Sequence, residues 1–139
     1  MTQISITKLD DLKLMYVQAS SFPDGIKEAW DKLESPLTNL KGRKFYGTTR
    51  LVDGVMEYRA CVIPLDDSEP SRLGFATFTV PSGYYATKKL INWTSQTHLI
   101  KIIFEELDSK YALDPNRPHI EFYRSQKEVV LMAPILQMK

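Results

Sequence analysis

The segment His119–Tyr123 holds the side chains of this chain that are best suited to chemistry. It alternates apolar and polar residues as a half-buried strand does, so Ile120 and Phe122 should point to one face and Glu121 to the other, together with its two polar flanks. Ile120 and Phe122 are expected to pack under the helix of the second half. Glu121 is then either a solvated carboxylate, which is the more frequent situation on strands, or the acid at the floor of an apolar groove. In the second setting it could offset the positive charge of a ligand.

Aromatic side chains could supply the walls of such a groove. At strand and helix spacing they more often belong to a core, because large rings bury most of their surface. The seven Tyr against six Phe mildly favour a partly polar cavity, since a buried phenol hydroxyl needs a hydrogen-bond partner. The residues concerned are Tyr16, Trp30, Tyr46, Tyr58, Tyr84, Tyr85 and Trp93.

Other chemistries have little support in the sequence. The glycines are isolated, so no phosphate-binding loop is recognisable. Cys61 is the only cysteine, which excludes an intramolecular disulfide and a thiolate metal cluster, and its apolar neighbours indicate a buried, inert thiol. His98 and His119 are too few for a His-rich metal site. We therefore expect no metal and no cofactor.

Composition indicates one folded domain. The 139 residues are 43% hydrophobic and 25% charged, which is near the average for globular proteins. A net charge of +1 provides no basic field for nucleic acid. Because no stretch has the length and apolarity of a membrane span, and the start does not resemble a signal peptide, the sequence predicts a cytoplasmic protein that does not bind membranes.

In the first half, the sequence predicts a strand, a helix and a hairpin. Apolar positions recur at helical spacing until Pro36, which lacks the backbone N–H that a helix interior needs. Two β-branched and aromatic runs flank Asp53-Gly54, the strongest short hairpin signal. The expected elements are a strand over 13–20, a helix over 26–34, and strands over 44–52 and 55–63.

The second half repeats this order after a polar, breaker-rich linker over 66–71. Its helix has the clearest apolar periodicity in the chain. The expected elements are a strand over 75–80 that can continue over 84–90 past a bulge or bend, a helix over 100–111, and strands over 120–123 and 129–132.

These elements predict an α+β fold built from two strand-helix-strand-strand modules, over about 13–65 and 75–136 of a single domain, 1–139. Antiparallel hairpins would form the sheet, and the two main helices would cover it. A groove between the modules is a common place for a small-molecule pocket, since side chains of both halves can converge there.

The order and spacing of several segments resemble the GyrI-like effector-binding domains. These are ligand-binding modules that are attached to some AraC-type and MerR-type regulators and also occur alone. One departure is that many members carry Trp late in the second helix, where this chain has Phe104-Glu105-Glu106-Leu107. The segments that carry the resemblance are 44–47, 57–62, 78–86, 118–123 and 133–135.

The resemblance implies a groove that binds amphipathic, often cationic aromatic compounds. In such domains an acidic residue of the motif that matches 120–123 reaches into the groove, which makes Glu121 the best single site candidate. DNA binding in cis is not expected, because the dozen residues before the first strand are too few for a helix-turn-helix. The ligand-binding residues that we expect are Glu121, Tyr123, Tyr58, Tyr46, Tyr16 and Trp93.

Three functions stay open at this point. The first is a stand-alone module that binds cationic aromatic compounds, for drug sensing or sequestration. The second is a hydrolase of electrophilic natural products, with Glu121 as general base and Tyr58 or Tyr46 as hydrogen-bond donor. The third is a protein-interaction module like the gyrase inhibitors. The sequence also leaves open whether the chain forms a homodimer or binds a protein partner.

Overall fold

The computed structural model describes residues 3–136, which form strands and helices in the order expected of two repeated units. The first unit comprises β1 (Ser5–Leu9), β2 (Leu12–Gln18), α1 (Ile26–Glu34), β3 (Phe45–Val52) and β4 (Val55–Val62). A short helix, α2 (Glu69–Leu73), follows. The second unit comprises β5 (Ala76–Val80), β6 (Gly83–Ile91), a 3-10 turn η1 (Trp93–Ser95), α3 (His98–Lys110), β7 (His119–Tyr123) and β8 (Glu128–Pro134).

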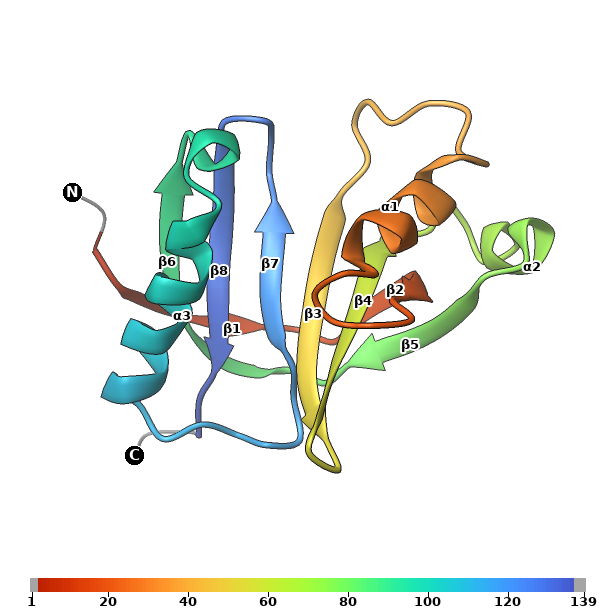
Figure 1. The fold of residues 1–139 in the computed structure, drawn as a ribbon. Helices are drawn as coiled ribbons and strands as arrows, with labels where there is room; N and C mark the ends of the chain where they lie inside the picture. The colour runs from red at the N-terminus through yellow and green to blue at the C-terminus, as the bar shows by residue number, and fades with distance from the viewer. Residues whose placement is uncertain (1–2, 137–139) are drawn as a thin grey trace.

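The eight strands form one antiparallel sheet in the order β1-β6-β8-β7-β3-β4-β2-β5. Its six central strands read as a palindrome, because β2-β4-β3 of the first unit meets β7-β8-β6 of the second at the β3–β7 pair. Helices α1 and α3 lie on the same face, each over its own unit (Figure 1). The predicted α+β fold with two strand-helix-strand-strand modules is therefore confirmed.

The outer strands are exchanged between the units, which the sequence did not indicate. β1 pairs with β6, and β5 pairs with β2. The expected continuation of the strand over 75–80 into 84–90 past a bulge is therefore wrong, since β5 and β6 lie in different parts of the sheet. Helix α2 begins within the expected linker over 66–71, and β1 was not predicted at all. Short edge strands have weak local signals because their partners lie far away in sequence.

The Asp53-Gly54 hairpin is confirmed. Val52 faces Val55 in the register of β3 and β4, so the loop has two residues. Both have positive φ, 51° at Asp53 and 80° at Gly54. This is the backbone that a type I′ turn requires and that Asp-Gly adopts readily.

Alternation along the strands separates two cores on the two faces of the sheet. On the helix-bearing face, Ile103 and Leu107 of α3 pack over β6 and β8, while Ala29 and Leu33 of α1 pack over β2 and β4. The opposite face carries its own core, to which all strands from β2 to β8 contribute: Leu14, Tyr46, Cys61, Val80, Tyr85, Ile120, Val130 and Met132.

The expectation that Ile120 and Phe122 pack under α3 is wrong. Both belong to the opposite face, where Ile120 is fully buried and Phe122 stacks on Tyr46 with ring centroids 4.7 Å apart. α3 covers the adjacent strand β8 instead. Alternation thus assigned the right residues to each face of β7, but sequence alone could not tell which face the helices cover.

No helix within residues 3–136 is long and apolar enough to cross a membrane.

Candidate functional site

A partly buried, hydrogen-bonded cluster surrounds Glu121 on the helix-bearing face, at the β3–β7 junction of the two units. The Tyr58 hydroxyl donates to Glu121 Oε1 at 3.2 Å, and the Tyr123 hydroxyl donates to the same oxygen. The Trp30 indole N–H donates to the Tyr58 oxygen at 3.1 Å. We call these four residues the Glu121 cluster. Its members come from α1, β4 and β7, so both units build it.

Gly47 makes room for this cluster. It lies opposite Glu121 in the β3–β7 register and opposite Ala60 in the β3–β4 register. A Cβ at this position would lie 2.4 Å from the Tyr58 hydroxyl and 2.7 Å from Glu121 Oε1. The side chains can therefore approach each other only because β3 has no side chain here.

Burial controls the protonation of the cluster. Desolvation raises the pKa of Glu121, and the two tyrosine hydroxyls that donate to it partly oppose that rise. Burial and the negative charge of Glu121 hold the pKa of Tyr58 and of Tyr123 well above their usual range. Both phenols therefore remain neutral donors at physiological pH, while the carboxylate is easier to protonate than a solvated one.

The carboxylate also has capacity for a further partner. Both hydrogen bonds to it end on Oε1, and Oε2 accepts none from residues 3–136. Part of the surface of Glu121 remains exposed to solvent. Oε2 is thus available to a cationic or hydrogen-bonding ligand.

A cavity of about 760 Å³ lies beside the cluster, between α1 and the end of β7. Its size is within the range of drug-binding pockets, about 300–1,000 Å³. Trp30 and Tyr123 of the Glu121 cluster line it, and Phe45 and Trp93 add further aromatic wall, whereas Glu121 itself is not a lining residue. The Tyr123 ring contacts Trp30 at 5.5 Å and Trp93 at 5.1 Å between centroids. We call this cavity the aromatic pocket; the turn after β7 and the loop before β3, which both line it, lie near the top of Figure 1.

Two of the four charged residues that line the aromatic pocket form ion pairs. Arg43 binds the buried Glu69 at 2.7 Å, and Arg124 binds Glu128 at 3.2 Å. Glu34 and Lys41 also line the pocket. Burial, followed by the charge of Asp31, raises the pKa of Glu34.

The structure brings together only some of the residues expected at the site. Tyr58, Tyr123 and Glu121 meet in the cluster, and Trp93 lines the pocket. Tyr46 and Tyr16 lie on the opposite face of the sheet. Tyr46 stacks on Phe122, and Tyr16 packs edge-on against Phe78 at 5.1 Å. Tyr46 directly precedes Gly47 in β3, and Tyr16 pairs with Cys61 of β4, whose side chain points away from that of Tyr58. Because successive residues of a strand point to opposite faces, Tyr46 and Tyr16 cannot reach Glu121.

Sequence reasoning missed two residues of the site. Trp30 is among the aromatic residues that could line a groove but not among the expected ligand-binding residues, although its indole N–H needs a partner when it is buried, and that need was the available signal. Gly47 had no signal, because only the pairing of β3 with both β4 and β7 shows what it faces.

No protein-family model matches the chain, and no curated protein is similar to it in sequence. Solved structures are similar in fold. The integron cassette protein VCH_CASS2 of Vibrio cholerae has 17% identity and a TM-score of 0.70, with 96% of this chain and 95% of that chain covered. SAV2435, solved with tetraphenylphosphonium bound, has 11% identity and a TM-score of 0.67, with 96% and 94% covered. The C-terminal domain of EcmrR has 9% identity and a TM-score of 0.68, with 99% of each chain covered.

The chain has the fold of the GyrI-like effector-binding domains. In this GyrI-like fold the Glu121 cluster occupies the junction of the two units, next to the pocket between them. Where many members carry a late helix Trp, Phe104 contacts His119 edge-on at 5.2 Å. The His119 ring also forms a hydrogen bond with the Asp108 carboxylate at 2.8 Å, so it contacts both Phe104 and Asp108 of α3. Neither His98 nor His119 lines the aromatic pocket.

Proposed function

We propose that the chain binds lipophilic organic cations in the aromatic pocket, with Glu121 as the compensating charge. The observation that carries the proposal is a carboxylate held on one oxygen by two neutral phenols beside an aromatic cavity of drug size. The similarity in fold to SAV2435, which binds tetraphenylphosphonium, supports the same class of ligand.

The charges near the pocket favour a cation once the ion pairs are counted. Arg43 and Arg124 are neutralised by their partners. Glu34 and Lys41 offset each other, which leaves the charge of Glu121 uncompensated. A cation at roughly 6 Å from a carboxylate gains about 3 kcal/mol at an effective dielectric constant near 20. Trp30, Trp93 and Tyr123 add cation–π attraction and apolar contact.

Calorimetric titration with tetraphenylphosphonium and with the neutral triphenylphosphine oxide tests this proposal. We expect the wild type to prefer the cation. Glu121→Gln should weaken binding of the cation at least tenfold and change binding of the neutral compound little, because only the charge-dependent attraction is lost. Glu105→Gln is the matched control, since Glu105 is an exposed carboxylate on α3 outside the pocket. Equal losses for both ligands in Glu121→Gln would refute the role of its charge.

Hydrolysis of electrophilic compounds is a second candidate function, favoured by the two phenols that donate to Glu121. A carboxylate whose pKa burial raises is a stronger base than a solvated one and could activate water. Tyr58 could then stabilise an oxygen anion, provided that its hydroxyl leaves Glu121. Incubation with epoxides and other strained rings, followed by mass spectrometry, should show turnover that Glu121→Gln and Tyr58→Phe abolish. Tight binding of several compounds without turnover by the wild type would refute this candidate.

A further inference from the structure

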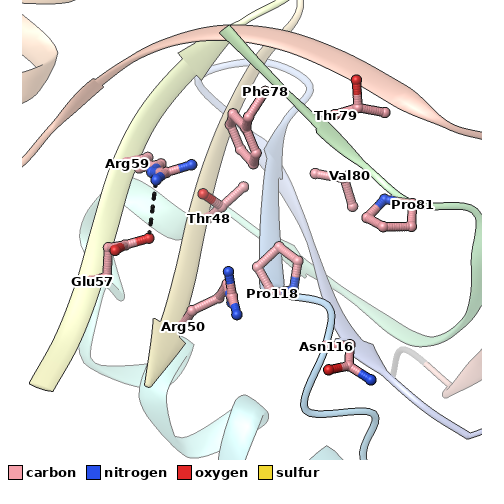
Figure 2. A pocket seen from close by; sticks show the side chains of 10 residues that line it. All are labelled: Thr48, Arg50, Glu57, Arg59, Phe78, Thr79, Val80, Pro81, Asn116 and Pro118. Atoms are coloured by element: carbon pink, nitrogen blue, oxygen red, sulfur yellow. Dashed lines mark ion pairs between the residues drawn. The ribbon is translucent and has the colours of Figure 1, made fainter. Parts of the chain in front are cut away.

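A second, smaller cavity lies on the face of the sheet opposite the Glu121 cluster, over β3 and β4. Thr48 and Arg50 of β3, and Glu57 and Arg59 of β4, alternate with Gly47 and Tyr58 and line it, as Figure 2 shows. The cavity has a volume of about 150 Å³, too small for a drug-sized ligand. At about 30 Å³ for each water molecule, it has room for roughly five waters or one small organic molecule.

Arg59 is held in a fixed position at one side of this cavity. Its guanidinium lies over the Tyr16 ring at 4.2 Å and over the Phe78 ring at 4.6 Å. It also donates to Gln18 at 3.3 Å and pairs with Glu57 at 3.3 Å, and its side chain is 20% exposed. A guanidinium fixed in this way loses little conformational entropy when it binds an anion.

Two further groups make the cavity suitable for an anion. The buried Thr48 hydroxyl has only a weak partner among residues 3–136, the Cys61 thiol at 3.9 Å. Arg50 forms no ion pair and no side-chain hydrogen bond with residues 3–136. Glu57 neutralises one of the two arginines, so the lining carries one net positive charge.

The rest of the wall is mainly apolar. Val80, Pro81 and Pro118 supply apolar wall, the Phe78 ring lies against the Arg59 guanidinium, and Thr79 and Asn116 complete the lining (Figure 2). One positive charge beside an apolar wall fits a singly charged anion with a short hydrocarbon part. We propose that this cavity binds a small organic monocarboxylate, with Arg50, Arg59 and the Thr48 hydroxyl receiving the carboxylate.

Inorganic phosphate fits the same surroundings less well. It is mostly a dianion at neutral pH, and its oxygens would face Val80 and the two prolines without donors. The planar carboxylate matches the guanidinium fork and leaves its carbon chain for the apolar wall.

NMR titration of the nitrogen-15-labelled full chain with isobutyrate tests the proposal. We expect saturable shifts confined to amides of β3, β4 and β5 around the cavity. The neutral isostere isobutyramide should cause no saturable shift, and phosphate should bind more weakly than isobutyrate. Phosphate that binds as tightly, isobutyramide that competes, or the absence of saturation would each overturn the proposal.

Three variants add a second test. Arg50→Gln and Thr48→Val should each weaken isobutyrate binding about fivefold or more, because each removes one contact to the carboxylate. Lys27→Gln removes an exposed charge on α1 and should leave it unchanged. Tetraphenylphosphonium binding should be unaffected by all three, so failure here can be told apart from failure of the proposed function. Wild-type affinity for isobutyrate in both cavity variants would contradict the assignment.

Discussion

The chemistry proposed for Glu121 depends on a balance between burial and hydrogen bonding at a single carboxylate. Desolvation favours the neutral acid, whereas the Tyr58 and Tyr123 hydroxyls favour the carboxylate. Since a raised pKa in the folded chain means that ionisation costs stability, this carboxylate lowers the stability of the fold as pH rises. A bound cation would recover that free energy.

Cation binding should therefore depend on pH. Because the pKa of Glu121 is raised above its usual 4.5, tetraphenylphosphonium affinity should rise with pH, with a midpoint above 4.5. Titrations between about pH 4 and 8 in wild type and Glu121→Gln measure this dependence. Glu34, whose pKa is also raised, remains in the variant, so any slope that it causes persists there. An identical slope in both proteins would show that Glu121 does not titrate in the site.

Gly47→Ala tests the close approach in the Glu121 cluster. The new methyl group would meet the Tyr58 hydroxyl at 2.4 Å and Glu121 Oε1 at 2.7 Å. We expect a loss of about 1–3 kcal/mol in the free energy of unfolding by urea, as for other overpacked sites. Tyr58→Phe in the same chain should recover part of the loss, since it removes the nearest atom. Purely additive effects of the two changes would argue against this contact.

At the scale of elements, α2 supports the rim of the aromatic pocket. Glu69 at its start accepts from Arg43 at 2.7 Å and from the Leu65 N–H at 2.9 Å. Arg43 belongs to the loop that leads into β3 and lines the pocket. Burial opposes ionisation of Glu69, but these donors hold its pKa below the usual value. The short helix therefore anchors a loop of the site from outside it.

Glu69→Gln should destabilise the chain by about 1–3 kcal/mol, since it leaves the Arg43 guanidinium buried without a full counter-charge. The pKa of Glu69 is lowered, so its stabilising contribution exists above the usual carboxyl pKa and disappears as pH falls through the lowered one. Urea unfolding at neutral and at acidic pH should therefore show a difference between wild type and variant that narrows in acid. Asp31→Asn, in the exposed pair with Lys27, should change stability by less than about 0.5 kcal/mol. A Glu69 effect as small as that of Asp31 would contradict the anchoring role.

Local patterns predicted the two main helices, the Asp53-Gly54 hairpin and the common face of Glu121 and Tyr123, because each depends on residues near in sequence. Patterns could not predict the exchange of β1 and β5, which is set by pairing between distant strands. For the same reason local patterns could not show that Tyr46 and Tyr16, which were expected at the site, lie on the face of the sheet opposite Glu121. Trp30 reaches Tyr58 only once α1 is packed on the sheet.

At the scale of the whole molecule, the exchanged strands interlock the two units. β1 of the first unit extends the sheet beside β6, and β5 of the second extends it beside β2. Neither unit can complete its part of the sheet without the other. We therefore expect the chain to fold as one cooperative domain.

Single-tryptophan variants test this cooperativity. Trp30 reports on the first unit and Trp93 on the second, so Trp93→Phe and Trp30→Phe isolate the fluorescence of each half. In urea, each fluorescence transition should coincide with the far-ultraviolet circular dichroism transition of the same variant. Separate midpoints for fluorescence and circular dichroism within one variant would show that the units unfold independently.

A crystal structure of the chain with tetraphenylphosphonium would show most directly whether a lipophilic cation occupies the aromatic pocket beside Glu121. We expect phenyl rings against Trp30, Trp93 and Tyr123, with the phosphonium centre on the side of the pocket nearest Glu121. The hydrogen bonds from Tyr58 and Tyr123 to the carboxylate should persist in the complex. A cation bound elsewhere on the chain, with the aromatic pocket unoccupied, would refute the proposed role of the pocket.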